Sequence, residues 1–288
     1  MTLARAARPT RLRVTIVAAI LAIAGLLIAS NMTANAATPS ATRSTTATKP
    51  SIVLVHGAWA DGSRWSQVVR NLQDAGYAVD VPPNPLRGIA ADSAYLHDFL
   101  TQSPNLQGKP VVLVGHSYGG FVISNAAFGA PGVKALVFVD AFVPKQDDTL
   151  LGLTVPPSCF AADPTTVFDF VPYPGGPPGD VDLYVKQNLF PGCFANGLPA
   201  TQGAALAATQ RPLAASVLTQ PSGVPAWKTI PSWDLIGTAD HVIPKAAQLA
   251  MAQRAHAQIT EIHAPHLSMV SDPGAVTRVI INAAHAVS

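Results

Sequence analysis

Charged residues are scarce in this chain. Only 12% of its 288 residues are Asp, Glu, Lys or Arg, with 18 basic and 16 acidic residues. Nucleic-acid-binding proteins need a basic surface, and proteins held on a membrane surface by charge need a polybasic segment, so this balance excludes both classes. Hydrophobic residues make up 49% of the sequence. That share excludes disorder over most of the chain and is enough for one large α/β domain.

Acidic residues are absent before Ala37. A basic stretch ends at Arg13, an apolar run covers residues 14–29, and residues 34–36 form the small-x-small sequence Ala-Asn-Ala. This order is typical of a secretory signal peptide. We therefore expect residues 1–36 to be removed and the protein to be secreted, either outside the cell or within the cell envelope. An uncleaved membrane anchor is the alternative, although the run is short for a span of about 20 residues.

A short leader is expected to follow the signal peptide. Residues 37–50 are rich in Ser, Thr, Ala and Pro, and they lack apolar periodicity. Such a composition predicts a flexible segment.

Cysteine is almost absent, with only Cys159 and Cys193 in the chain. Neither lies in a glycine-flanked turn of the kind that holds a nucleophile, so a catalytic cysteine is not expected. Both fall in the part that we expect to be exported, where an even number of cysteines predicts one disulfide. Two buried free thiols are the alternative.

From residue 51 onward, short β-branched runs alternate with stretches of helical periodicity. Such alternation predicts parallel strands joined by helical crossovers, with both faces of the sheet covered. Residues 51–288 are therefore predicted to form one α/β domain with a mostly parallel, doubly wound sheet. The expected strands are 52–55, 77–81, 111–114, 135–139, 233–236 and 259–262, and the expected helices are 65–75, 91–100, 121–127, 246–255 and 273–284.

The alternation stops between about residues 144 and 228. This insertion is dense in Pro and Gly and contains both cysteines. Because proline has no N–H for a ladder and disrupts helix interiors, we expect a small cap without sheet. Short helices are predicted at 183–189 and 203–208.

Ser117 is the expected nucleophile. It is the central residue of Gly115-His116-Ser117-Tyr118-Gly119, which follows a predicted strand and opens a predicted helix. A tight strand-to-helix turn strains the central residue and leaves no room for side chains two residues away, so both of those positions are glycine. An ordinary turn serine is the alternative.

A serine hydroxyl is a poor nucleophile at neutral pH and needs a base, for which we choose His266. It lies in the loop after the last predicted strand, at the carboxyl edge of the sheet where ligands bind in such folds. His263, which ends that strand, is the second choice. Asp240, in the loop after strand 233–236, is the expected acid that orients His266. Asp140 ends an earlier strand at the same edge and stays open as the alternative acid.

Two backbone N–H groups are expected to stabilise the oxyanion. One belongs to Tyr118, the residue after the nucleophile. The other belongs to Ala58 in the loop after the first strand, where Gly57 permits a close approach; Trp59 is the second choice. Trp59 and Phe142 are also candidate lining of a substrate pocket, with ordinary core packing as the alternative.

Three segments, 53–59, 114–120 and 237–244, resemble those of a known group of enzymes. They are similar to the bacterial α/β-hydrolases related to plant methyl-ester esterases and hydroxynitrile lyases. The resemblance covers about residues 51–284 and is weak in the cap. It implies the α/β-hydrolase fold with an eight-stranded sheet, a small cap and no cofactor. It also implies catalysis by Ser117, Asp240 and His266, with Ala58 and Tyr118 as oxyanion donors.

One residue departs from the lyase pattern and bears on the reaction. The plant lyases have a lysine directly after the catalytic histidine, where this sequence has Leu267. We therefore expect a secreted serine hydrolase that cleaves carboxylic esters of small molecules through an acyl-enzyme, without a metal. Its activity should fall as the pH drops through about 6 to 7, where a histidine base gains a proton. A cofactor-free lyase or a perhydrolase on the same site is the alternative, and a binding protein is a third; the oligomeric state is left open.

Overall fold

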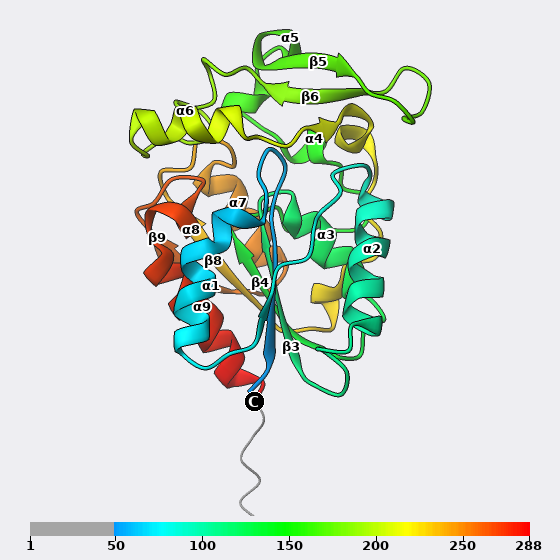
Figure 1. Ribbon diagram of the computed structural model, residues 1–288, viewed down its shortest axis with the longest axis vertical. Coiled ribbons are helices and arrows are strands. Elements are labelled where there is room, and N and C mark those ends of the chain that lie inside the picture. Colours follow the sequence, from blue (N-terminus) through cyan, green and yellow to red (C-terminus); the bar gives the residue numbers. More distant parts are fainter. Residues whose placement is uncertain (1–48) are drawn as a thin grey trace, which may run out of the picture. The chain divides into compact units, whose positions relative to one another are not determined.

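The computed structural model describes residues 49–288, and its centre is a six-stranded parallel sheet (Figure 1). The strands lie in the order β2-β1-β3-β4-β8-β9, and every neighbouring pair is parallel. The strands β1 and β3 are rich in Val, Leu and Ile and are buried along their whole length, as expected when helices cover both faces. The bounds are β1 Ser51–Val55, β2 Val79–Asp80, β3 Val111–His116, β4 Val133–Val139, β8 Ser232–Gly237 and β9 Gln258–Ile262.

Helices cover both faces of this sheet, as the sequence predicted. The pair α2 and α3 packs together on one side, and the pair α1 and α9 packs together on the other (Figure 1). The helix α7 packs against β8 and β9. The bounds are α1 Ser66–Asp74, α2 Ile89–Gln102, α3 Gly119–Ala126, α7 Lys245–Arg254, α8 Ser268–Ser271 and α9 Pro273–Ala286, with the 3-10 turn η1 at Gly62–Trp65.

The sheet is smaller than the resemblance implied, with six strands in place of eight among the described residues. The second strand is also shorter than expected. Residues 77–81 were predicted to be extended, but only Val79–Asp80 pairs with β1.

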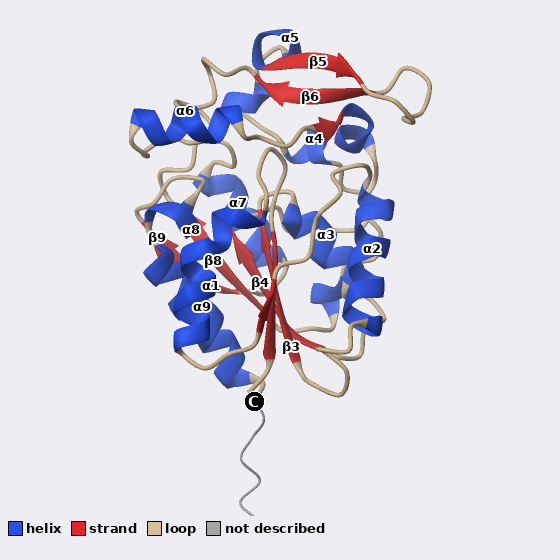
Figure 2. Cartoon of the chain, viewed as in Figure 1, coloured by secondary structure: helices blue, strands red, loops and turns tan. Residues whose placement is uncertain are grey.

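The cap contains sheet, so the prediction of a sheet-free insertion was wrong. Three short antiparallel strands form it, apart from the central sheet (Figure 2). Proline is tolerated because Pro172 ends an edge strand, and the Pro- and Gly-rich stretch 174–179 forms the loop between two strands. The bounds are β5 Phe168–Pro172, β6 Val181–Val185 and β7 Leu213–Ala214.

The cap helices agree only in part with the prediction. The expected helix 203–208 lies within α6, whereas the expected helix 183–189 begins as strand β6 and continues as turns. The predicted disulfide between Cys159 and Cys193 is present and joins two segments of the cap. The bounds are α4 Leu150–Leu153, η2 Cys159–Ala161, α5 Pro164–Val167, α6 Ala200–Ala208, η3 Ala215–Thr219 and η4 Ala226–Lys228.

The predicted signal peptide and most of the leader lie outside the described residues. Within residues 49–288 there is no helix with the length and apolar character needed to cross a bilayer. The carboxyl ends of the central strands all open toward the cap (Figure 1), which gathers the loops that carry the candidate site residues.

Candidate active site

Ser117 lies on the tight turn between β3 and α3, with a positive φ of 52°. This turn leaves no room for a side chain two residues to either side of Ser117. A Cβ on Gly115 would lie 2.7 Å from the carbonyl oxygen of Gly119, and one on Gly119 would lie 2.8 Å from the carbonyl oxygen of Val55. The two glycines of the motif are therefore required by close packing, and the Ser117 side chain is held at the end of β3.

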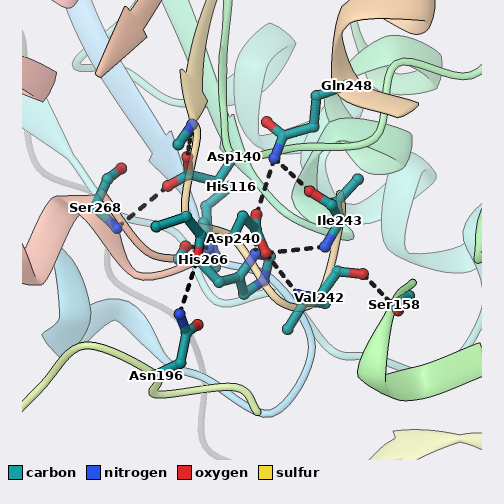
Figure 3. A network of polar contacts seen from close by, with 12 residues as sticks. His116, Asp140, Ser158, Asn196, Asp240, Val242, Ile243, Gln248, His266 and Ser268 are labelled. Carbon is teal, nitrogen blue, oxygen red and sulfur yellow. Dashed lines mark hydrogen bonds and ion pairs between the residues drawn. The ribbon is translucent and has the colours of Figure 1, made fainter. Parts of the chain in front are cut away.

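His266 and Asp240 form a buried hydrogen-bonded pair (Figure 3). His266 Nδ1 lies 2.8 Å from Asp240 Oδ2, and both side chains are fully buried. Burial lowers the pKa of His266 to about 3, so the imidazole is neutral at neutral pH. With Nδ1 donating to the carboxylate, Nε2 carries the lone pair that a general base needs.

Four donors converge on the Asp240 carboxylate (Figure 3). The backbone N–H groups of Val242 and Ile243 donate to Oδ1 at 2.7 and 2.9 Å, and Gln248 Nε2 donates to Oδ2 at 2.9 Å beside His266. Burial raises the pKa of Asp240, while the hydrogen bonds from Ile243, Val242 and Gln248 act against that rise by stabilising the carboxylate. The Asp240 side chain is thus held in one position by its hydrogen bonds.

His116, the residue before Ser117, joins the turn at residues 115–119, called the elbow here, to the segment that carries His266. His116 Nε2 donates to the carbonyl oxygen of His266 at 2.9 Å, and the two imidazole rings lie 4.7 Å apart. Within residues 49–288, His266 Nε2 is buried and has no hydrogen-bond partner. Ser117 and His266 therefore lie in adjacent segments without a hydrogen bond between their side chains, a situation that is common before substrate binds.

The loop after β1 approaches the elbow closely. A Cβ on Gly57 would lie 2.7 Å from Ser117 Cβ and 2.9 Å from the His116 carbonyl oxygen. No acceptor within residues 49–288 takes the backbone N–H of Ala58 or of Tyr118. The Tyr118 hydroxyl donates to Asp92 Oδ2 at 2.8 Å, which fixes that side chain away from its own backbone N–H.

Asp140 and His263 have other contacts. Asp140 Oδ1 accepts from the Gly237 N–H at 2.8 Å and Oδ2 from the Ser268 N–H at 3.2 Å, so the carboxyl joins β8 to the loop after His266 (Figure 3). Burial and the nearby Asp240 raise its pKa. His263 is exposed at the end of β9, 3.4 Å from Thr238 Oγ1. Among these histidines and acids, the hydrogen-bonded pair is His266 with Asp240.

A small apolar cavity of about 40 Å³ lies beside Ser117. Trp59 and Phe142, the two residues predicted to line a pocket, both face it, and no charged side chain does. Trp59 is buried, has a positive φ of 54° and donates its indole N–H to the Leu183 carbonyl oxygen in the cap at 2.8 Å. The rest of the lining is Tyr118, Leu150, Leu151, Thr154, Phe160, Pro164, Phe168, Leu218 and Val242.

Two polar residues of the site were not anticipated from the sequence. Gln248 contacts Asp240 from α7, eight residues along the chain, and Asn196 Nδ2 donates to the Ala239 carbonyl oxygen from the cap at 2.8 Å. Neither residue belongs to a sequence motif, and each comes close to the loop of Asp240 only in the folded chain. Within residues 49–288 no group of three or more His, Cys, Asp or Glu side chains is arranged to hold a metal ion.

Two curated proteins of similar sequence were found. The carbendazim hydrolyzing esterase of Nocardioides sp. (strain SG-4G) is 37% identical over 110 residues, which are 35% of this chain and 46% of that protein. The match therefore spans less than half of that esterase. The alpha/beta hydrolase nvfD of Aspergillus novofumigatus (strain IBT 16806) is 26% identical over 254 residues, which are 82% of this chain and 97% of that protein.

Solved structures share the fold at lower sequence identity. An extracellular alpha/beta-hydrolase from a Paenibacillus species superimposes with a TM-score of 0.66 at 22% identity, covering 81% of this chain and 98% of that one. Polyneuridine aldehyde esterase superimposes with a TM-score of 0.69 at 20% identity, covering 82% and 99%. A family model described as the alpha/beta hydrolase family matches residues 52–279, which is well over half of the chain. The protein therefore belongs to the alpha/beta hydrolase family.

Proposed function

We propose that this protein is a secreted serine esterase that cleaves carboxylic esters of small molecules. The observation that carries the proposal is the buried His266–Asp240 hydrogen bond, with His266 Nε2 unpartnered among the described residues and next to the Ser117 elbow. This arrangement supplies a nucleophile, a neutral base and an acid in the chain order that hydrolases of this fold use. Two of the similar proteins, the carbendazim hydrolyzing esterase and polyneuridine aldehyde esterase, are esterases by their names, which supports the proposal.

The proposed reaction has two steps. His266 Nε2 takes the proton of the Ser117 hydroxyl while Oγ attacks the ester carbonyl carbon. The N–H groups of Ala58 and Tyr118 stabilise the negative charge on the carbonyl oxygen, and the bond to the alcohol breaks as His266 returns the proton to it. Water then attacks the acyl-enzyme with His266 again as base, which releases the acid and restores Ser117.

The cavity supports uncharged, short acyl groups as substrates. Its lining carries no charged side chain, and a volume of about 40 Å³ admits only a few water-sized groups. A charged acyl group would lose its hydration there without a partner, which is costly. We expect turnover of p-nitrophenyl acetate to exceed that of the octanoate, and p-nitrophenyl hemisuccinate to react poorly.

Removal of the nucleophile tests the proposal. Ser117→Ala should lower kcat for p-nitrophenyl acetate by about 10³-fold or more and abolish labelling by a fluorophosphonate probe. Ser124→Ala is the matched control, because Ser124 is buried on the helix that follows and its hydroxyl has no hydrogen-bond partner within residues 49–288. Ester hydrolysis that survives Ser117→Ala would refute the proposal, and cyanide release from a cyanohydrin without ester turnover would reassign the site to a lyase.

Export through residues 1–36 is part of the proposal. The Cys159–Cys193 disulfide supports it, because disulfides form and persist in oxidising compartments. The mass of the protein recovered outside the cytoplasm should correspond to a chain that starts at Ala37. A chain that keeps its first 36 residues would contradict removal of the signal.

A further inference from the structure

The two half-cystines belong to cap segments that border the active site. Cys159 is followed by Phe160, and Cys193 is followed by Phe194. The bond joins positions that are 34 residues apart, with a Cα–Cα distance of 5.9 Å. Segment 158–160 enters one 3-10 turn, and segment 192–197 consists of turns without helix or strand. Neither segment has an α-helix or a β-strand of its own to fix it.

Both segments hold the loop that carries Asp240. From segment 158–160, Ser158 Oγ donates to the Val242 carbonyl oxygen at 2.6 Å and the Cys159 N–H donates to the His241 carbonyl oxygen at 2.9 Å (the first of these is drawn in Figure 3). From segment 192–197, the Gly192 carbonyl oxygen accepts from His241 Nδ1 at 3.1 Å. Asn196 Nδ2 donates to the Ala239 carbonyl oxygen at 2.8 Å. The loop 239–243 is thus hydrogen-bonded to both of the cap segments that the disulfide joins.

The same segments pack on His266 and on the loop after β1. The Phe194 ring lies edge-on to the His266 ring with centroids 5.1 Å apart. Gly197 packs so closely on Pro265 that an added Cβ would lie 3.2 Å from its ring. The Trp59 ring has its centroid 4.9 Å from that of Phe160 and 6.1 Å from that of Phe194. The disulfide therefore joins the segment of Phe160, which packs on Trp59, to the segment of Phe194, which packs on both Trp59 and His266.

We propose that the Cys159–Cys193 disulfide is a positioning element of the active site, which holds segments 158–160 and 192–197 so that they fix the acid loop 239–243 and His266. The inference rests on the proposed function of this site as an esterase. Loops without regular structure open at a low free-energy cost unless they are tied down. Without the disulfide, each segment is held in place only by its own hydrogen bonds and packing contacts. A small displacement of a catalytic group lowers the reaction rate strongly.

The test compares the oxidised enzyme with the variant C159A/C193A at a temperature where circular dichroism shows both to be folded. We expect kcat for p-nitrophenyl acetate to fall about tenfold or more, with a smaller change in KM, because the displaced groups act on the transition state. Hydrogen exchange of the peptide that contains Val242 and Ile243 should be faster, since their N–H groups donate to Asp240. A double variant whose kcat stays within about twofold and whose exchange is unchanged would leave the disulfide as a stabilising tether only and overturn the inference.

Reduction provides a reversible form of the same experiment. A dithiol such as dithiothreitol gives two electrons and two protons to the bond, closing to its own disulfide while Cys159 and Cys193 become thiols. The reduced enzyme should match C159A/C193A, and reoxidation should restore kcat. Full activity in the reduced enzyme, with the free thiols verified by mass, would contradict the inference.

Two further variants separate positioning from general loosening of the cap. Asp180→Ala removes hydrogen bonds to Tyr173 and Ser216, and within residues 49–288 the Asp180 side chain makes no hydrogen bond to loop 239–243, so Tm should fall while kcat is kept. Asn196→Ala removes one bond to loop 239–243 with the disulfide intact, and it should lower kcat with little change in Tm. An equal loss of kcat in Asp180→Ala would overturn the inference.

The exchange measurement also distinguishes failure of the inference from failure of the proposed function. If the oxidised protein hydrolyses no ester and its Ser117 is not labelled by a fluorophosphonate, the esterase proposal fails. Faster exchange of loop 239–243 in C159A/C193A would still show that the disulfide positions this loop. Unchanged exchange would overturn the inference whatever the activity.

Discussion

Asp140 accepts a hydrogen bond from the backbone N–H of Ser268, two residues beyond His266, at 3.2 Å. Its other carboxyl oxygen accepts from the Gly237 N–H at the end of β8, 2.8 Å away. A Cβ on Gly237 would lie 2.7 Å from that oxygen, so the glycine is needed for the contact. One side chain at the end of β4 thus fixes both the strand that leads to Asp240 and the segment that carries His266.

Asp140→Ala should therefore destabilise the fold more than it impairs the chemistry. The substitution leaves the N–H groups of Gly237 and Ser268 buried without an acceptor, which costs about 2 kcal/mol or more. We expect kcat/KM to fall about tenfold, because His266 is held less firmly. Urea unfolding and ester kinetics measure the two effects.

Asp240→Asn is the comparison that decides between the two acids. It should lower kcat by about 10⁴-fold, because an amide in place of the carboxylate favours the wrong imidazole tautomer. If Asp140→Asn lost as much activity as Asp240→Asn, the acid would be Asp140, the alternative that the sequence left open.

Gln248→Met should lower kcat while KM stays nearly constant. Methionine fills a similar volume but cannot donate, so Asp240 Oδ2 loses its 2.9 Å bond and keeps only His266 as a donor. The loss of one hydrogen bond to a charged group corresponds to about a tenfold change in kcat. Steady-state kinetics with a thermal unfolding curve would test this, and an unchanged kcat would show that the two backbone donors at Oδ1 are sufficient to hold the acid.

The local residue types were enough to predict the tight turn at Ser117 and the loops at the carboxyl edge of the sheet in which Asp240 and His266 lie. Gly115 and Gly119 mark a tight turn with no room for side chains at those positions, and Asp240 and His266 follow the neighbouring parallel strands β8 and β9, whose carboxyl ends meet at one sheet edge. The roles of these residues remain proposals. Gln248 was beyond prediction because its contact depends on how α7 folds back over the acid loop, and no local pattern encodes that.

The cap shows why the rest was harder. Phe168–Pro172 and Val181–Val185 have residues typical of strands, but the Pro- and Gly-rich stretch between them suggested that the whole insertion lacked sheet. The stretch instead forms the connection of a hairpin. The contacts of the cap with loop 239–243 join residues more than 40 positions apart, and only the folded chain brings them together.

Activity should persist to lower pH than a free histidine would allow. Burial lowers the pKa of His266 to about 3, from an ordinary value near 6.5. A base acts only when it is unprotonated, so a lowered pKa keeps it active as the pH falls through 6.5, and the loss comes nearer to the lower value. We therefore expect activity to be lost at a pH below the range of 6 to 7 that the sequence suggested.

The measurement is kcat/KM for p-nitrophenyl acetate from about pH 4 to pH 8, which reports the pKa of groups in the free enzyme. Samples returned to pH 7 after exposure to acid should regain full activity, which separates titration from unfolding. Half-maximal kcat/KM between pH 6 and 7 would contradict the shift and show that water reaches the imidazole of His266.

Gly57→Ala should impair the oxyanion site specifically. The new Cβ would lie 2.7 Å from Ser117 Cβ and 2.9 Å from the His116 carbonyl oxygen, distances that real Cβ atoms do not adopt, so the loop must move away from the elbow. The Ala58 N–H moves with it, and loss of one oxyanion donor costs about 10²-fold or more in kcat. Gly132→Ala is the matched control, because its Cβ would meet only the Lys109 carbonyl oxygen at 3.6 Å. Equal kcat in the two variants would mean that the loop after β1 takes no part in stabilising the transition state.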